Sequence, residues 1–131
     1  DRIMSYNIAR QVSPQVAILS FSSAGAGNVV FASVNGQFSI TGTGTSTLQL
    51  EAGYEYFLTS SPVTSSATAA TFYHIVDGVN GTSYSIVSTS FTSGLDQQIE
   101  SIQSDATSTF SLNCNQATSS NSRLEIWRIP L

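Results

Sequence analysis

Two short strands separated by a tight turn can be read directly from residues 46–59, whose sequence is STLQLEAGYEYFLT. Before the turn, leucines alternate with polar residues, and after it Tyr54, Tyr56 and Leu58 alternate with their neighbours. A period of two places every second side chain on the same face of a strand. The stretch therefore predicts two strands, each with one apolar face, on either side of a turn that ends at Gly53.

The same period extends over most of the chain. Alternating stretches predict strands at residues 16–21, 28–34, 37–41, 46–50, 54–59, 71–76, 82–90, 107–114 and 123–129. Residues 96–102 fit either a strand or a single helical turn. Turn residues such as Asn35-Gly36 and Asp77-Gly78 separate these stretches. Short strands at intervals of about eight to twelve residues are typical of an antiparallel sandwich or barrel, so we expect an all-β antiparallel fold.

The composition excludes several classes of function. The 131 residues include four arginines, no lysine and eight acidic residues, so only 9% of the chain is charged. An ordinary soluble domain has roughly 25%. Four arginines cannot neutralise a phosphate backbone, so we expect no nucleic-acid partner. The longest apolar runs have four residues, far short of the about 18 that a membrane-spanning helix needs, so we expect no membrane insertion.

The length predicts a single domain. Hydrophobic residues make up 40% of the chain, which suffices for a core and argues against intrinsic disorder. We place the domain at residues 16–131. Residues 1–15 lack a clear period and fit an N-terminal arm, a first strand or the end of a stalk. Because the chain opens with Asp1 rather than Met, we expect it to be a processed piece of something longer.

Catalytic and metal sites find little support in the sequence. His74 is the only histidine, and no Gly-x-Ser-x-Gly motif accompanies it, so we expect a packing or interface residue. Cys114 stands alone and alternates with apolar residues, which favours a buried thiol over an interchain disulfide or a reactive nucleophile. The segment Asp77–Thr82 resembles a calcium loop only faintly, and a tight turn explains it better. We therefore expect no enzyme activity, no cofactor and no bound metal.

Two apolar residues near the C-terminus alternate away from the predicted core. Trp127 and Ile129 point opposite to Leu124 and Ile126 if residues 123–129 form a strand. An apolar face opposite the core is a mark of a subunit interface. We expect this face to be buried between protomers. A sugar-binding platform built from tyrosines and Trp127, or a core on both faces of the sheet, are the alternatives.

The chain from Gly36 to Leu131 resembles the C1q/TNF-like jelly-roll head domains of bacteriophage virion proteins, especially tail fibres. The resemblance rests on the order of four features: residues 46–59, residues 71–78, the strand around Ile99 and Ile102 before residues 104–107, and the last pair at 109–112 and 123–129. These features are patterns of alternation and turns. No catalytic residue comes with them.

The resemblance implies an antiparallel jelly-roll sandwich that assembles as a homotrimer around a threefold axis. We assign the trimer interface to Tyr54, Tyr56, Trp127 and Ile129. It also implies a non-enzymatic structural role at the virion surface, where the partners would be a fibre shaft or a major capsid protein, together with a host-surface glycan.

Two virion roles fit this fold. The first is the trimeric receptor-binding head of a phage tail fibre, and the second is a trimeric capsid decoration (cement) protein that stabilises the phage head. A secreted carbohydrate-binding module or lectin is a further alternative. Binding sites for a receptor are expected on loops at the distal end of the domain. The residues that represent these loops are Thr64, Asp77, Asn80, Asn115 and Asn121.

Overall fold

The structure is a computed structural model that describes residues 14–22, 26–64, 69–86 and 98–131. No described residue lies in a helix. The described strands are β1 Gln15–Ser22, β2 Gly27–Asn28, β3 Val30–Gly36, β4 Leu48–Leu50, β5 Tyr54–Ser61, β6 Ala70–Val76, β7 Val79–Asn80, β8 Tyr84–Ile86, β9 Gln98–Ser104, β10 Ser108–Cys114 and β11 Arg123–Pro130. The predicted all-β fold is thus confirmed.

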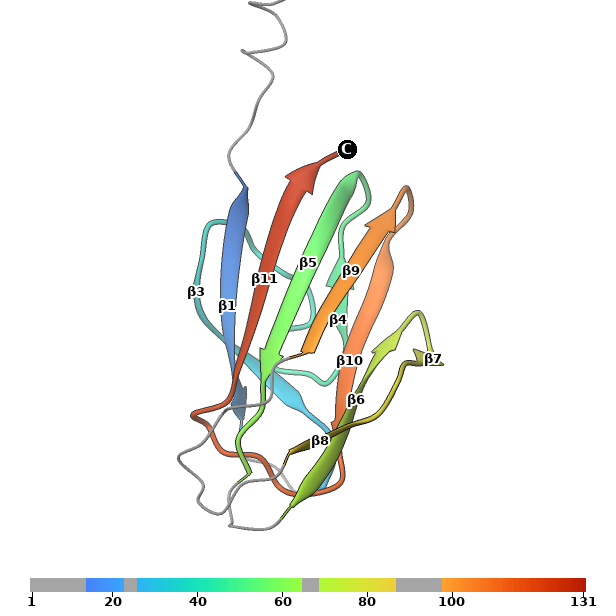
Figure 1. The fold of residues 1–131 in the computed structure, drawn as a ribbon. Helices are drawn as coiled ribbons and strands as arrows, with labels where there is room; N and C mark the ends of the chain where they lie inside the picture. Colours follow the sequence, from blue (N-terminus) through green and yellow to red (C-terminus); the bar gives the residue numbers. More distant parts are fainter. Residues whose placement is uncertain (1–13, 23–25, 65–68, 87–97) are drawn as a thin grey trace, which may run out of the picture.

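The strands form two antiparallel sheets that lie against each other as two layers (Figure 1). The five-stranded sheet has the order β3-β1-β11-β5-β9. In the six-stranded sheet the order is β2-β10-β6-β7, with β4 also paired to β10 and β8 to β6. Several strands that are neighbours in a sheet are far apart in the sequence. For example, β1 pairs with β11 along most of its length.

The core fills the space between the two layers. Fully buried side chains from the five-stranded sheet include Phe21, Leu58 and Leu124, and they meet Phe72 and Phe110 from the six-stranded sheet. Complete burial of one such side chain stabilises the fold by about 1.5–3 kcal/mol. Alternation in the sequence placed Leu124 on an inward face, as observed, because each strand presents one face to the other sheet.

Seven of the predicted strands coincide, to within two residues at each end, with β1, β3, β4, β5, β6, β10 and β11. The sequence of residues 96–102 fits either a strand or a helical turn. The described part of this segment forms strand β9. Only residues 84–86 of the predicted strand 82–90 form β8, and residues 87–90 lie outside the described part.

Two predictions near residue 36 are wrong. Asn35 and Gly36 do not form a turn but continue β3, where they pair with Ile18 and Ala17. Residues 37–41 do not form a strand apart from one isolated bridge at Thr41. The reason is visible at Gln37, whose backbone and side chain both bond to Val16 at distances of 2.8 and 2.9 Å, so the chain turns across the start of β1.

A two-residue turn at Asp77-Gly78 joins β6 to β7, as predicted. Both residues have positive φ, 51° and 77°, which suits the right-handed twist of a tight hairpin and favours glycine. The Asp77 carboxylate accepts a hydrogen bond from the Thr109 amide at 2.9 Å, and the Asp77 amide donates to the Thr109 carbonyl at 3.0 Å. These bonds fix the hairpin to the start of β10, so the carboxylate has a structural role.

The sandwich has two distinct ends (Figure 1). At one end β1 begins and β11 finishes, with Gln15 paired to Arg128, and we call this the attachment end. At the opposite end lie the connections from β5 to β6 and from β10 to β11, and we call this the loop end. Because β1 begins at the attachment end, any chain that precedes it must enter there. Residues 1–13, which include most of the predicted arm or stalk, lie outside the described residues.

Candidate functional site

The outer side of the five-stranded sheet carries large exposed apolar side chains. Trp127 on β11 and Phe57 on β5 are directly paired, and 38% and 37% of their surfaces remain exposed. Val16 on β1 pairs with Trp127 from the other side. Since the neighbouring Leu58 and Ile126 point into the core, these three side chains must point away from it. They form an apolar row across three central strands.

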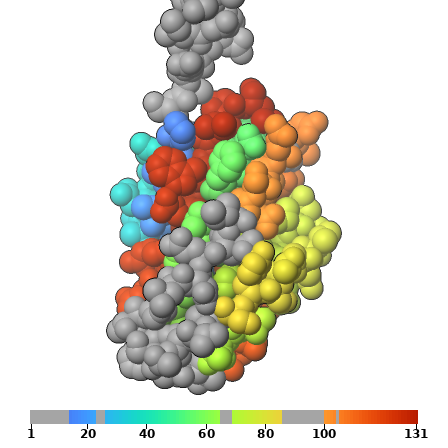
Figure 2. Space-filling view, in the orientation of Figure 1, coloured from blue at the N-terminus to red at the C-terminus, as the bar shows by residue number. Residues whose placement is uncertain are grey.

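Two further residues extend this row. Ile18 and Ile129 are partly exposed and share the outward alternation of Val16 and Trp127. The indole nitrogen of Trp127 donates a hydrogen bond to the Glu125 carboxylate, which holds the ring in place. We call Val16, Ile18, Phe57, Trp127 and Ile129 the outer apolar face. Figure 2 looks onto this side of the molecule, where β11 (red) lies between β1 (blue) and β5 (green).

The predicted trimer interface is divided between the two sides of the sheet. Trp127 and Ile129 belong to the outer apolar face, as alternation predicted. Tyr56 does not, because it is only 1% exposed and lies in the core of its own chain. Tyr54 is half-buried on the same inward side and packs against that core. The placement of the two tyrosines on an outer interface is therefore wrong.

Phe57 is the residue that sequence reasoning missed on this face. The signal was present, because Phe57 lies between Tyr56 and Leu58 and must therefore point the opposite way. The prediction assigned Tyr54 and Tyr56 to the interface, and these lie on the opposite face of β5 from Phe57. Phe57, which pairs with Trp127 across β5 and β11, takes the place on this face that the prediction gave to Tyr56.

The predicted receptor loops are only partly brought together. Thr64 in the β5–β6 connection bridges to Thr118 in the β10–β11 connection, so these two loops meet at the loop end. Thr64 itself is fully buried, and its prediction as a surface contact is wrong. Asn115 and Asn121 are exposed at the loop end, as a contact residue must be.

A buried serine fixes the two loops to each other. The Ser122 hydroxyl accepts a hydrogen bond from the Val63 amide at 2.7 Å and lies 3.1 Å from the Val63 carbonyl, to which it donates. The Ser119 amide donates to the same carbonyl at 2.7 Å. These bonds make the described part of the loop end a preorganised surface. Residues 65–68 lie outside the described part.

Asp77 and Asn80 lie elsewhere. The side-chain oxygen of Asn115 accepts a hydrogen bond from the Thr71 amide near the start of β6, whereas Asp77 follows the last residue of the same strand. Seven residues of strand span about 20 Å. The hairpin with Asp77 and Asn80 is therefore separate from the loop end, and the prediction that it shares a distal end with the other loops is wrong.

His74 is a packing residue in the core, in agreement with the expectation from alternation. It is 2% exposed and its ring lies 5.1 Å from the ring of Phe110. Its Nε2 atom is 2.7 Å from the Ser60 hydroxyl, and Nδ1 is 3.5 Å from a carboxylate oxygen of Glu100, without a hydrogen bond among the described residues. Burial lowers the pKa of His74 to about 4, so the imidazole is neutral at pH 7.

The order of Ser60, His74 and Glu100 has the connectivity of a Ser-His-acid triad. A catalytic serine must reach a substrate carbonyl, because the geometry of the attack defines the triad. Ser60 is 0% exposed, and its hydroxyl is directed to His74 inside the core. The arrangement therefore acts as a polar link between the two sheets.

Cys114 is buried as predicted, and burial raises the pKa of its thiol and disfavours the reactive thiolate.

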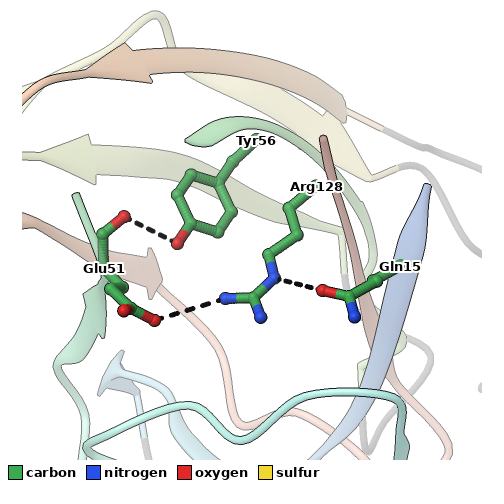
Figure 3. Close-up of polar contacts among 4 residues, drawn as sticks. All are labelled: Gln15, Glu51, Tyr56 and Arg128. Atoms are coloured by element: carbon green, nitrogen blue, oxygen red, sulfur yellow. Dashed lines mark hydrogen bonds and ion pairs between the residues drawn. The ribbon is translucent and has the colours of Figure 1, made fainter. Parts of the chain in front are cut away.

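A buried arginine lies between the layers at the attachment end (Figure 3). Arg128 is 8% exposed, and its guanidinium carbon lies 4.0 Å from the ring centre of Phe38 and 3.9 Å from that of Tyr54. Its Nε atom donates to the side-chain oxygen of Gln15 at 2.8 Å, and Nη1 lies 3.5 Å from the carboxylate of Glu51. Stacking and hydrogen bonding thus hold the guanidinium in one orientation.

Tyr56 completes this cluster. Its hydroxyl donates to the backbone carbonyl of Glu51 at 2.8 Å. Burial raises the pKa of Tyr56, and the hydrogen bond with Arg128 acts in the opposite direction. A pocket of about 200 Å³ is lined by Arg128, Glu51, Tyr56 and Phe38, among others. No pattern in the sequence predicts this cluster, since its members come from separate parts of the chain.

Within the described residues, no group of three or more histidine, cysteine and acidic side chains is placed to hold a metal ion. The same part of the chain contains no helix that is long and apolar enough to cross a membrane.

Comparison with known proteins supports the fold. No protein-family model matches the sequence, and no curated protein matches it. Among solved structures, the crystal structure of murine APRIL is similar with a TM-score of 0.64 and 11% sequence identity, over 89% of this chain and 100% of that chain. APRIL has a TNF-type jelly roll. The fold is a C1q/TNF-like jelly roll. At 11% identity the likeness concerns the fold alone. In this jelly roll, the outer apolar face lies on β1, β11 and β5, the three central strands of the five-stranded sheet.

Proposed function

We propose that this chain is the trimeric, receptor-binding head domain of a bacteriophage tail fibre, a non-enzymatic protein of the virion surface. The observation that carries the proposal is the outer apolar face on a jelly-roll sheet. Trp127 and Phe57 are large, paired and exposed, and polar residues such as Glu125 and Ser101 lie beside them. Apolar surface of this kind, rimmed by polar residues, marks a protein–protein contact.

A second copy of the same chain is the partner that this face fits. The resemblance to virion head domains implies three copies around a common axis. In such an arrangement the outer apolar face of each copy would be covered by its neighbours, which would remove Trp127 and Phe57 from water. A homotrimer would also hide part of each surface, which suits a chain with few charges.

The arrangement of the two ends of the sandwich favours a domain at the tip of a fibre over a domain in the middle of one. Chain that precedes β1 joins at the attachment end, while the preorganised loops with Asn115 and Asn121 are presented at the opposite end. A receptor approaching the tip would meet the loop end first. The virion setting itself rests on the resemblance in sequence.

Binding to host cells tests this function. We expect the purified domain to adsorb to host cells or to a glycan array, and Asn121→Ala to reduce adsorption. Asn80→Ala, in the separate exposed hairpin, is the matched control and should bind as the unaltered domain does. Binding to empty capsids without adsorption to cells or glycans would instead identify a capsid decoration protein. Glycan binding by a monomer would favour a carbohydrate-binding module.

A further inference from the structure

Arg128 is a buried cation whose charge is only partly balanced. Its side chain is 10% exposed, whereas that of its carboxylate partner Glu51 is 71% exposed. The two groups are 3.5 Å apart, at the outer limit of a hydrogen bond. Buried charges in proteins are normally paired at short range, because removal from water is costly. The structure thus retains a cation where an alternating strand usually places an apolar side chain.

The guanidinium is preorganised for a planar partner. Phe38 and Tyr54 stack against it at 4.0 and 3.9 Å, and Gln15 holds its Nε atom at 2.8 Å. With two rings stacked against the guanidinium, its edge is the part left to meet a ligand. An arginine edge matches the two oxygens of a carboxylate, which it binds through parallel hydrogen bonds.

A pocket lies against this arginine and has polar walls. Its volume is about 200 Å³, and the polar side chains of Ser39, Thr41, Gln49 and Thr107 line it together with Arg128. These groups donate and accept hydrogen bonds, and they suit a ligand that carries hydroxyl groups. The size suits one small molecule rather than a chain of several units. Glu51 stands at the same pocket on an exposed side chain that is free to move away.

We propose that this pocket binds the carboxylate of a small hydroxylated acid, of the class of acidic monosaccharides. Arg128 holds the carboxylate, the surrounding hydroxyl and amide groups hold the sugar hydroxyls, and Glu51 is the internal competitor that the ligand displaces. The site lies between the sheets at the attachment end, away from the loop end. It goes beyond the proposed function, and its failure would leave receptor binding by the loops unaffected.

Titration with glucuronate, followed by NMR chemical shifts or calorimetry, tests the site directly. We expect a dissociation constant of about 1 mM, a value in keeping with one charged contact and a few hydrogen bonds. Glucose, which lacks the carboxylate, and acetate, which lacks the hydroxyls, should each bind at least about tenfold more weakly. Equal binding of glucose or of acetate, or no binding of glucuronate, would overturn the proposal.

Two substitutions assign the binding to this arginine. Arg128→Lys should weaken glucuronate binding by about tenfold or more, because an ammonium group cannot form the parallel pair of hydrogen bonds. Arg123→Lys on the same strand is the control, since Arg123 is exposed and bonds to the backbone of the neighbouring loop, and it should leave binding unchanged.

Glu51→Gln keeps the proposal testable even if Arg128→Lys fails to fold, because Glu51 lies on an exposed turn. Removal of the competing carboxylate should tighten glucuronate binding by about threefold. Unchanged or weaker binding to Glu51→Gln would contradict the assignment of Glu51 as competitor and of Arg128 as the carboxylate site.

Discussion

His74 links the two sheets through a neutral imidazole. Ser60 on β5 meets one ring nitrogen at 2.7 Å, and Glu100 on β9 lies 3.5 Å from the other. The folded-state pKa of about 4 is below the ordinary value of 6.5, so at intermediate pH the unfolded chain binds a proton that the folded chain does not. The stabilisation is complete above pH 6.5 and is lost as the pH falls from 6.5 towards 4.

The pH dependence of stability tests this reading of His74. Between pH 7 and pH 4.5, we expect the free energy of unfolding to fall by about 2 kcal/mol through this residue. Urea unfolding at the two pH values gives the measurement, and His74→Gln provides the control because it cannot titrate. The difference between the two proteins isolates His74 from the carboxylates, and an equal loss in both would show that His74 does not contribute.

Gly42 and Gly44 lie in the loop before β4 and show how backbone constraints shape this element. Both have positive φ, 101° and 87°, a region that suits glycine. A Cβ atom at Gly42 would overlap the carbonyl oxygen of Thr47, whereas at Gly44 it would meet nothing within 4 Å. The loop therefore requires glycine at position 42 for its positive φ and for the close Thr47 carbonyl, and at position 44 for its positive φ alone.

Alanine substitution separates the two effects. Gly44→Ala should lower the free energy of unfolding by about 1 kcal/mol through backbone strain. Gly42→Ala should cost clearly more, because the Thr47 carbonyl must also move. Thermal or urea unfolding of the two variants gives the comparison, and equal losses would mean that the loop relaxes freely around position 42.

The loop end should depend on Ser122. Without its hydroxyl, the Val63 amide loses its partner in a buried site. Ser122→Ala should therefore lower the free energy of unfolding by about 1–3 kcal/mol. Ser120→Ala, at an exposed position in the same loop, should change it by less than about 0.5 kcal/mol. Unfolding of the two variants at the same urea concentration would show that the Ser122 hydroxyl does not stabilise the loop end.

Alternation in the sequence predicted the elements well and the clusters poorly. It identified strands such as β5 and β11 and the inward position of Leu124, because a strand that packs on another layer has one apolar face. It misjudged residues 37–41, where Gln37 bonds to β1 and diverts the chain. It could not foresee the Arg128 cluster, because Phe38 and Tyr54 reach Arg128 only through the tertiary fold.

For the molecule as a whole, the sparse charge follows from how the surface is used. The chain is rich in serine and threonine, whose hydroxyl groups bind water without charge, while Trp127 and Phe57 expose apolar area on one sheet. In the proposed homotrimer this apolar area is covered, so fewer charges are needed. The absence of lysine has no further explanation in the structure.

The double substitution Phe57→Ala with Trp127→Ala should weaken the trimer without unfolding the chain, since both side chains lie outside the core. Loss of two large apolar contacts per copy should raise the concentration of half-dissociation by about tenfold or more. Val79→Ala is the control, because Val79 is 69% exposed on the other sheet. A trimer of unchanged stability would place the interface elsewhere.

Sedimentation equilibrium of the unaltered domain at micromolar concentration tests the central claim most directly. Association through the outer apolar face predicts a mass three times that of one chain. The mass of a single chain at this concentration would contradict the homotrimer and, with it, the role proposed for Trp127 and Phe57.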